Sequence, residues 1–313
     1  MPRLVLRAIL CSVLLSAVSV PARSMGIEES ISVGIRGHVV RTEIFSLFAS
    51  PGEPISLTLP QHDSSELKLF LGDQAYGRAE PGQWSFNAPD QPGLYPLTLH
   101  HGDNEIPLRL NLFVGVPASQ IEGERLNGYR LGPPPPGHER YGSLYRAPES
   151  FIEVTAENVD TRLTPHFTLG QFLCKQEGDF PKYVALNESL LVLLENLLQA
   201  VREAGYGVDT FGVISGYRTP DYNRRIGNVP NSRHVYGDAM DLFVDEDGDG
   251  RMDDLNGDGR HDREDVDLLY GIVEQVKAIP ENAQLAGGVG RYYQASHHGG
   301  FIHVDARGYR ARW

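Results

Sequence analysis

Short runs in which apolar and polar residues alternate fill the first third of the chain. Clear examples are residues 55–59, 67–71 and 108–112, and turn-forming pairs such as Pro92-Gly93 lie between runs of this kind. A period of two is typical of half-buried β-strands. Regular short strands predict a small all-β sandwich over residues 27–116.

One stretch of this region resembles a known kind of domain. The run from Trp84 to Pro89, followed by Pro92-Gly93-Leu94-Tyr95, is similar to the late strands of immunoglobulin-like bacterial surface modules. We identify no catalytic residue here. The resemblance therefore implies an immunoglobulin-like sandwich that serves as a spacer or docking domain.

The hydrophobic pattern changes in the second half. Apolar residues recur at helical spacing from Leu190 to Val201 and from Val266 to Val276. Short apolar runs at 211–214, 240–244 and 301–305 predict strands. We expect an α+β domain over residues 151–313.

A proline-rich segment separates these two regions. Residues 133–136 are four consecutive prolines, which favour extended polyproline II and a semi-rigid spacer. Tyr129, Tyr141 and Tyr145 indicate that the segment packs on a domain. Residues 117–150 are predicted to be a linker.

The first residues have the features of a secretory signal. Arg3 and Arg7 precede an apolar run at 8–20, and small residues at 22 and 24 fit cleavage before Met25. An uncleaved membrane anchor is the alternative, but the run is short for a membrane span. We expect a signal peptide at 1–24, a periplasmic or secreted protein, and no transmembrane anchor after cleavage.

Composition, net charge and cysteine content indicate the class of protein and argue against some partners. Among 313 residues, 41% are hydrophobic and 22% are charged, as in soluble globular proteins. The net charge of −13 argues against nucleic acid as a partner. Cys11 lies in the predicted signal, so Cys174 would be the only thiol of the mature chain, without an internal disulfide. We expect it to be buried and inert.

An insertion at residues 245–265 is strongly acidic. Oxygen-bearing residues at positions 1, 3 and 5, glycine at 6 and a carboxylate at 12 make a calcium-loop pattern, which fits from Asp254 to Asp265. The preceding loop has Asn256 at its twelfth position and is similar to the shorter loops of dockerin or thrombospondin repeats. The predicted calcium ligands are Asp245, Asp247, Asp249, Asp253, Asp254, Asn256, Asp258 and Asp265. A solvated acidic loop is the alternative.

Two histidines and a carboxylate are candidates for a transition-metal site. His234 and Asp241 lie seven residues apart, and His303 is in the last predicted strand. Three such ligands leave one zinc position open for water, whose pKa zinc lowers towards about 7. The pattern predicts metal-assisted hydrolysis. Taken singly, each histidine could equally be a surface or core residue.

Four blocks of sequence resemble one enzyme family. They are Ser215-Gly216-Tyr217-Arg218-Thr219-Pro220, Ser232-x-His234-x-x-Gly237-x-Ala239-x-Asp241, Gly287-Gly288-Val289-Gly290 and Phe301-Ile302-His303-Val304-Asp305. Together they are similar to the zinc D-alanyl-D-alanine carboxypeptidases and murein endopeptidases, which share the hedgehog-type zinc fold. The resemblance spans about residues 164–313, and its last two blocks look closest to the murein endopeptidases.

The resemblance implies roles for particular residues. His234, Asp241 and His303 would be the zinc ligands, and Arg218 would hold the substrate near the scissile bond through its forked guanidinium. A structural salt bridge is the alternative for Arg218. Ser232 would orient the loop of His234 and contribute to substrate binding, or merely cap a turn.

The general base does not follow from the family pattern. Relatives place an acidic residue three positions before the last zinc histidine, or a histidine two before it, but Gly300 and Phe301 stand there. Asp305 is one candidate, with orientation of an imidazole as its alternative role. His297 and His298 are the others, because histidine titrates in a range suited to proton transfer.

These expectations define the predicted function. The protein would be an exported zinc peptidase that hydrolyses amides at D-amino-acid centres of peptidoglycan stem peptides or cross-links. Two alternatives stay open. One is an inactive protein that binds peptidoglycan through the same cleft, and the other is a calcium-dependent structural or adhesion protein.

Overall fold

The structure, a computed structural model, describes residues 32–60, 64–296 and 298–313. The predicted signal peptide at 1–24 and the candidate base His297 lie outside the described residues. Within the described ranges, no helix combines the length and the apolar character that a membrane crossing requires.

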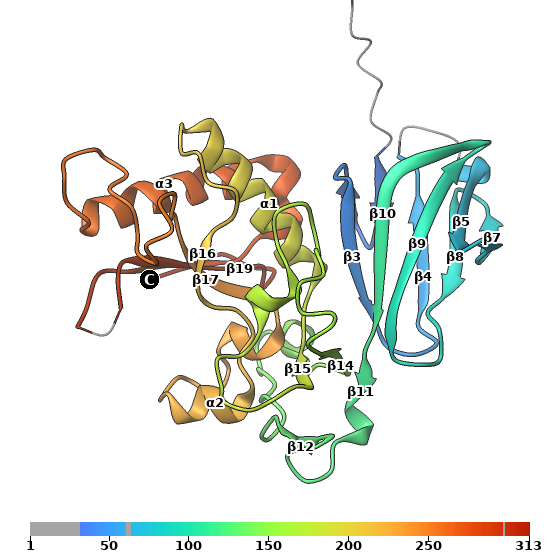
Figure 1. The fold of residues 1–313 in the computed structure, drawn as a ribbon, viewed down its shortest axis with the longest axis horizontal. Helices are drawn as coiled ribbons and strands as arrows, with labels where there is room; N and C mark the ends of the chain where they lie inside the picture. Colours follow the sequence, from blue (N-terminus) through green and yellow to red (C-terminus); the bar gives the residue numbers. More distant parts are fainter. Residues whose placement is uncertain (1–31, 61–63, 297) are drawn as a thin grey trace, which may run out of the picture. The chain divides into compact units, whose positions relative to one another are not determined.

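The N-terminal β region consists of two five-stranded sheets. The strands are β1 Val33–Ile35, β2 His38–Val40, β3 Ile44–Ala49, β4 Pro54–Thr58, β5 Leu67–Leu71, β6 Gln74–Ala75, β7 Arg78–Glu80, β8 Gln83–Asn87, β9 Gly93–His101 and β10 Asn104–Val114. Their orders are β2-β1-β4-β8-β7 and β3-β10-β9-β5-β6. Most pairs are antiparallel, whereas β10 and β3 run parallel. Figure 1 shows the long strands β9 and β10 beside β3.

Alternation along these strands explains why the region folds. In β5, Leu67 and Leu69 are buried while Lys68 between them is exposed, as a period of two requires. Leu108 and Leu110 follow the same pattern in β10. These side chains belong to the main hydrophobic core. The likeness to immunoglobulin modules stays a prediction.

A five-stranded sheet forms the centre of the C-terminal domain. Its strands are β16 Gly212–Ser215, β17 Ala239–Phe243, β18 Gly288–Tyr292, β19 Phe301–Asp305 and β20 Ala311–Arg312, in the order β16-β17-β19-β18-β20. The α-helices are α1 Glu188–Glu203, α2 Pro220–Arg225 and α3 Arg263–Ala278. The domain is therefore α+β, and Figure 1 shows α1 and α3 together on one side of this sheet.

Local signals account for the two long helices. Asn187 caps α1 by accepting a hydrogen bond from the Ser189 N–H, and leucines at helical spacing bury one face. Asp262 caps α3 and forms a capping box with Asp265. The periodicity predicted both helices.

The segment predicted to be a linker is folded against its neighbours. It contains the short strands and 3₁₀ turns β11 Val116–Pro117, η2 Ala118–Gln120, β12 Arg125–Leu126, β13 Tyr129–Arg130 and η3 Gly142–Tyr145. Tyr129 and Tyr145 are 7% and 5% exposed. Beyond it come β14 Ser150–Val154, η4 Leu169–Phe172 and β15 Lys182–Val184, and β11, β14 and β15 form one sheet.

Polar contacts join the β region to the C-terminal domain. The Arg36 guanidinium lies 2.5 Å from the Glu188 carboxylate at the start of α1. The Asn111 amide donates to the Arg162 carbonyl at 3.0 Å. All described residues belong to one compact unit.

Candidate metal centre

Strand register brings the candidate residues into one row across the C-terminal sheet. Ser215 on β16 pairs with Asp241 on β17, which pairs with His303 on β19. The row continues to Gly290 on β18. Directly paired residues have Cβ atoms about 4.5–5.5 Å apart, so this register places Asp241 and His303 side by side.

His234 completes the cluster from a neighbouring 3₁₀ turn, η5 Arg233–Tyr236, which ends at Gly237. Asp241 Oδ1 lies 2.8 Å from His303 Nδ1 and 3.1 Å from His234 Nε2, and the two nitrogens are 3.1 Å apart. Gly237 has φ of +80°, and a Cβ there would lie 2.3 Å from the Ala185 carbonyl oxygen. Glycine is therefore required for the turn between His234 and β17.

Hydrogen bonds on the far side of each ring orient the two imidazoles. His234 Nδ1 lies 2.7 Å from the Gly216 carbonyl oxygen and donates to it. His303 Nε2 lies 2.9 Å from Asp305 Oδ2. The opposite nitrogen of each ring therefore points at Asp241, the arrangement in which protein histidines ligate metals.

Burial and charge set the protonation of the cluster. His234, Asp241 and His303 are only 2%, 3% and 5% exposed. Burial lowers the pKa of His234. Burial also disfavours the protonated form of His303, which would lower its pKa. Hydrogen bonds to Asp241 and Asp305 outweigh this effect and raise the pKa of His303 to about 9. Burial alone would raise the pKa of Asp241, yet the two histidines hold it well below its usual range. A fixed carboxylate thus sits between two imidazoles.

Arg218 lies next to the cluster, as expected for a substrate-holding residue. Its terminal nitrogen donates to Asp241 Oδ2, and its Nε donates to Ser215 Oγ at 2.8 Å. The side chain is 11% exposed. The salt bridge weighed from the sequence is therefore present.

Asp305 lies behind His303 and is fully buried. Its carboxylate accepts from the Gly288 N–H at 2.8 Å and from the Arg307 guanidinium, besides its contact with His303. Burial would raise its pKa, but His303 and Arg307 hold it well below the ordinary range. This placement favours the imidazole-orienting role over that of a general base.

Local contacts are recorded for the two other residues predicted from the sequence, His298 and Ser232. His298 Nδ1 is 2.7 Å from the Gly299 carbonyl oxygen, and its ring meets Phe301 edge-on at 5.0 Å. Ser232 precedes η5 without a side-chain cap, and its carbonyl accepts from the Val235 N–H. Neither contact involves the three clustered side chains.

Sequence reasoning missed a set of residues that support the ligand loops. Arg233, next to His234, pairs with buried Asp238 and lies between the rings of Tyr145 and Tyr236, 4.6 and 4.7 Å from their centres. Its NH1 donates to the Leu144 carbonyl. The available signals were local, namely the adjacency of Arg233 to His234 and the nearby Tyr236 and Asp238, whereas Leu144 and Tyr145 come from the predicted linker.

Trp313 was also missed. Its ring centre lies 5.1 Å from that of His303, and its indole N–H donates to the Tyr292 hydroxyl at 2.8 Å. A Cβ at Gly290 would lie 2.4 Å from the Trp313 indole nitrogen. The Gly-Gly-Val-Gly block is therefore small where Trp313 packs against the strand.

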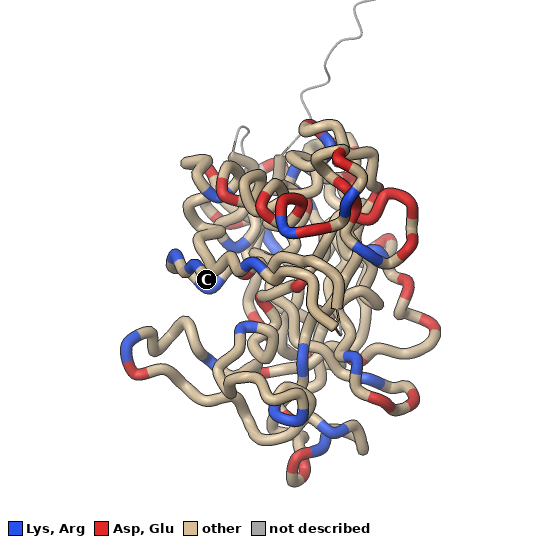
Figure 2. Tube along the Cα trace, turned by 90° about the vertical axis from the view of Figure 1, so that its left-hand side faces the viewer, with Lys and Arg blue, Asp and Glu red and all other residues tan. Residues whose placement is uncertain are grey.

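The acidic insertion brings together part of its predicted calcium ligands. Figure 2 shows acidic positions, in red, following one another along the trace. Carboxylate oxygens of Asp245, Asp247 and Asp253 lie within 4.8 Å of one another. Asp245 Oδ1 is buried without a hydrogen-bond partner in the described part of the chain. Asp249 belongs to the same loop, where its carboxylate accepts from the Arg251 N–H.

The second predicted loop repeats hydrogen bonds of the first, since Gly259 donates to Asp254 as Gly250 donates to Asp245. Asp254 accepts from the N–H groups of Gly257, Asp258 and Gly259. Asp265, expected as the twelfth ligand, is fully buried and accepts from the Leu255, Asn256 and Asp262 N–H groups. Its oxygens are thus engaged by the backbone at the start of α3. Calcium binding by Asp265 stays a prediction.

Comparison with known proteins identifies the family of this domain. Residues 165–256 match the family model described as Peptidase M15. This part of the C-terminal domain is similar to the M15 peptidases. The match covers Arg218, His234 and Asp241, whereas His303 lies beyond it. Curated proteins and solved structures give no significant match to the chain. The predicted resemblance to zinc D-alanyl-D-alanine peptidases is confirmed at the level of the M15 family.

The thiol of this M15 domain is buried, as predicted. Cys174 is 2% exposed and unpaired. Burial raises its pKa, so the thiolate is disfavoured. Cys174 is therefore not a candidate nucleophile.

Proposed function

We propose that the M15 domain is a zinc-dependent peptidase that hydrolyses amide bonds at D-amino-acid centres in peptidoglycan stem peptides or cross-links. The observation that carries the proposal is the convergence of His234 Nε2, Asp241 Oδ1 and His303 Nδ1 within 4.8 Å. The family supports a metallopeptidase acting on cell-wall peptides. The choice between exopeptidase and endopeptidase activity stays open in this proposal.

The donor set fits zinc on chemical grounds. Two imidazole nitrogens and one carboxylate oxygen are ligands that zinc accepts, and a catalytic zinc site keeps a fourth position for water or substrate. The hydrogen bonds from His234 to Gly216 and from His303 to Asp305 direct the ligating nitrogens. Bound by these side chains, zinc supplies Lewis acidity to the scissile carbonyl and lowers the pKa of water.

The chain's own residues orient the reactants. Arg218 is proposed to hold the substrate near the scissile bond, since three of its five N–H donors stay available beyond Ser215 and Asp241. Asp305 is proposed to hold His303 in place. His298 stays the proposed proton-transfer residue among the described candidates, and Ser232 stays a proposed contributor to substrate binding.

The acidic insertion is proposed to bind calcium through its first loop. The meeting of Asp245, Asp247 and Asp253 supports this, because three carboxylates at short distance repel one another without a counter-ion. For the same reason, burial and the neighbouring carboxylates raise the pKa of Asp253. Calcium titration of wild type and Asp245→Asn, followed by calorimetry, tests this proposal. Equal heats from both proteins would count against it.

The proposed setting is the periplasm or the outside of the cell. Export is supported by the signal-like residues 1–24 and by the cell-wall chemistry of M15 peptidases. The proposed organisation keeps a β-sandwich at 27–116, a linker at 117–150 and the peptidase domain at 151–313. A docking role for the sandwich stays part of this proposal.

Mass spectrometry of purified peptidoglycan fragments tests the proposed reaction. We expect the wild-type protein to hydrolyse one amide bond per product. The products are then either shortened stem peptides or stem peptides that have lost their cross-link. A zinc chelator and the substitution His303→Ala should each abolish the release. The masses of the products identify the bond and separate exo from endo cleavage.

Binding of the same fragments and metal analysis of the purified protein test the two alternatives. Retention of fragments without cleavage by zinc-loaded protein indicates a peptidoglycan-binding protein. Metal analysis that finds calcium without zinc indicates a calcium-dependent structural or adhesion protein. Either result contradicts the proposed hydrolysis.

A further inference from the structure

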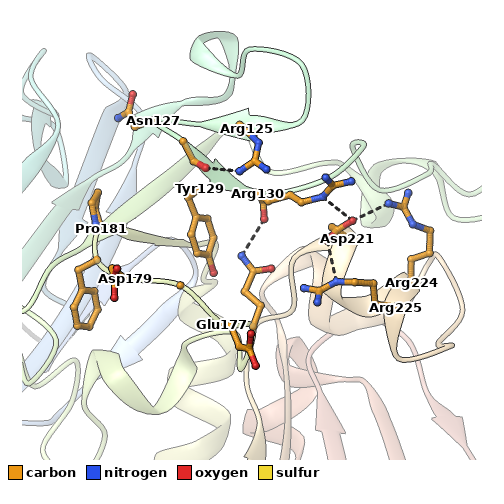
Figure 3. Close-up of a pocket in the computed structure, with 14 residues that line it drawn as sticks. Arg125, Asn127, Tyr129, Arg130, Glu177, Asp179, Pro181, Asp221, Arg224 and Arg225 are labelled. Atoms are coloured by element: carbon orange, nitrogen blue, oxygen red, sulfur yellow. Dashed lines mark hydrogen bonds and ion pairs between the residues drawn. The ribbon is translucent and has the colours of Figure 1, made fainter.

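A cavity lies outside the His-Asp-His cluster. It has a volume of 690 Å³ and is lined by the β12–β13 hairpin, the 176–181 loop and α2 (Figure 3). The hairpin belongs to the predicted linker, so this cavity combines linker and M15 residues. We call it the arginine pocket, because Arg125, Arg130, Arg224 and Arg225 line it.

Three of these arginines meet at one buried carboxylate. Asp221 is 3% exposed and lies 2.9 Å from Arg130 Nε, 2.7 Å from Arg224 and 3.0 Å from Arg225 Nε. Figure 3 shows the three guanidinium groups around it. Burial would raise the pKa of Asp221, but the arginines, led by Arg130, outweigh it and keep the pKa lowered. Asp221 is therefore ionised and holds the three guanidinium groups in place.

One carboxylate does not neutralise three guanidinium groups. Arg130 has a second partner in Glu124 at 3.1 Å, whereas Arg224 and Arg225 pair with Asp221 alone among the described residues. Arg125 donates to the Gly128 carbonyl, which carries no charge. Arg224 and Arg225 are 56% and 55% exposed, so most of their five N–H donors face solvent.

The opposite side of the pocket has a different character. Glu177 and Asp179 line it, and no ion pair to either residue is formed within the described part of the chain. Phe180 is 41% exposed and contacts the Lys182 ammonium. In Figure 3, Asp179 lies across the pocket from Arg224. The pocket thus offers a basic wall, two acidic groups and an apolar ring.

A short segment connects this pocket to the metal centre. Arg218 contacts Asp241, and only two residues separate Arg218 from Asp221 in the chain. Three residue steps span at most about 11 Å. Gln176 strengthens the connection, since it accepts from the Thr219 hydroxyl at 2.7 Å and donates to the Arg130 carbonyl at 3.0 Å. An extended peptide of about three residues covers a comparable distance.

We propose that the arginine pocket binds a free carboxylate of the peptidoglycan stem peptide whose amide bond is cut at the metal centre. Arg224 and Arg225 receive the carboxylate, because guanidinium forks pair with carboxylates in two parallel hydrogen bonds. The pocket places a local basic wall on a chain whose net charge of −13 would otherwise repel an anionic ligand. This inference rests on the proposed function.

Fluorescence anisotropy of a labelled synthetic stem pentapeptide tests the proposal directly. The probe is used in two forms, with all of its carboxylates free or all converted to amides. The proteins are the full chain as wild type and as the double variant Arg224→Gln with Arg225→Gln, each measured with zinc. We expect the double variant to bind the free-carboxylate probe about tenfold or more weakly, and the amidated probe unchanged.

A matched control removes the same amount of charge elsewhere. Arg78→Gln with Arg109→Gln takes two arginines from the N-terminal β region, and we expect unchanged binding of both probes. Circular dichroism establishes that each variant is folded. Equal weakening for both probes, or no weakening for either, overturns the proposal. Displacement of the probe by a phosphate polymer at lower concentration than by the peptide also overturns it.

The binding measurement keeps this inference separate from the proposed function. The wild-type protein could cut no substrate and still bind the free-carboxylate probe through Arg224 and Arg225. That result contradicts the proposed hydrolysis and supports the proposed role of the arginine pocket. If cleavage is observed and both probes bind all variants equally, the result supports the proposed hydrolysis and contradicts the proposed role of the arginine pocket.

Discussion

Asp241 and His303 are paired across the antiparallel strands β17 and β19, with Asp241 Oδ1 lying 2.8 Å from His303 Nδ1. The pairing links two positions that are 62 residues apart in the chain. His234 joins them from the turn that precedes β17. The proposed roles of these three side chains and of their neighbours can be tested by substitution.

The first prediction concerns the role of Asp305. In Asp305→Asn, His303 loses a charged acceptor, so we expect zinc affinity to fall about 10–100-fold. At saturating zinc, kcat should recover most of the wild-type value, because the residue orients a ligand and does not move the proton. Zinc titration and kinetics at high zinc measure both quantities. A large loss of kcat with zinc fully bound would instead assign Asp305 as the base.

A second prediction separates substrate holding from metal binding at Arg218. In Arg218→Lys, the forked guanidinium is replaced by a point charge that cannot reach Ser215, Asp241 and a substrate together. We expect kcat/KM to fall at least about 100-fold while zinc content is retained. Arg310→Lys, at a surface salt bridge with Glu274, is the matched control and should be unaffected. Unchanged kinetics for Arg218→Lys would leave it a structural salt bridge only.

A third prediction tests whether the predicted linker supports the metal centre. Tyr145 is 5% exposed and its ring packs on Arg233, the neighbour of His234. In Tyr145→Ala, we expect a destabilisation of about 3 kcal/mol and weaker zinc binding by folded protein. Denaturant unfolding and zinc titration measure the two effects. Tyr95→Ala, in the β region, should leave zinc binding as in wild type, and equal zinc affinity in both variants would refute the supporting role.

The fourth prediction is a pH dependence of stability. Burial lowers the pKa of Lys277 to about 8, although its ammonium donates to the Leu285 and Asp305 carbonyls. Between about pH 8 and about pH 10.4, the ordinary value for lysine, the unfolded chain binds more protons at this position than the folded one. The free energy of unfolding should therefore rise with pH in this window, by up to about 3 kcal/mol from this residue, and not below it.

Denaturant unfolding of wild type and Lys277→Met at several pH values isolates that contribution. The difference between the two proteins should change with pH only above about pH 8. Lys68→Met, at an exposed position of β5, should show a constant difference from wild type. A flat difference for Lys277→Met would show that its pKa is not lowered.

Several features followed from local sequence patterns. Alternation in 67–71 and 301–305 predicted β5 and β19, and the leucine spacing after Asn187 predicted α1. The chemistry of histidine and aspartate identified candidate ligands, which the structure gathers in one cluster. These inferences succeeded because strand and helix periodicity are properties of neighbouring residues.

Other features required the tertiary structure. The carboxylate of Asp265 matches a calcium-loop position, and only the structure shows that it also accepts three backbone N–H groups at the start of α3. The tyrosines of the proline-rich segment indicated that it packs on a domain, but only the structure shows that Leu144 and Tyr145 contact Arg233 beside His234. In both cases a local pattern indicated a role, but the contacting partners are set by the packing.

The sequence by itself determined which side chains are able to bind a transition metal and which segments form strands and helices. Only the tertiary structure decided that Asp241 faces His303, that Asp305 lies behind that ring, and that Asp221 gathers three arginines. The physical reason is that strand register and loop packing arise from contacts between residues distant in the chain, whereas periodicity reports only on close neighbours.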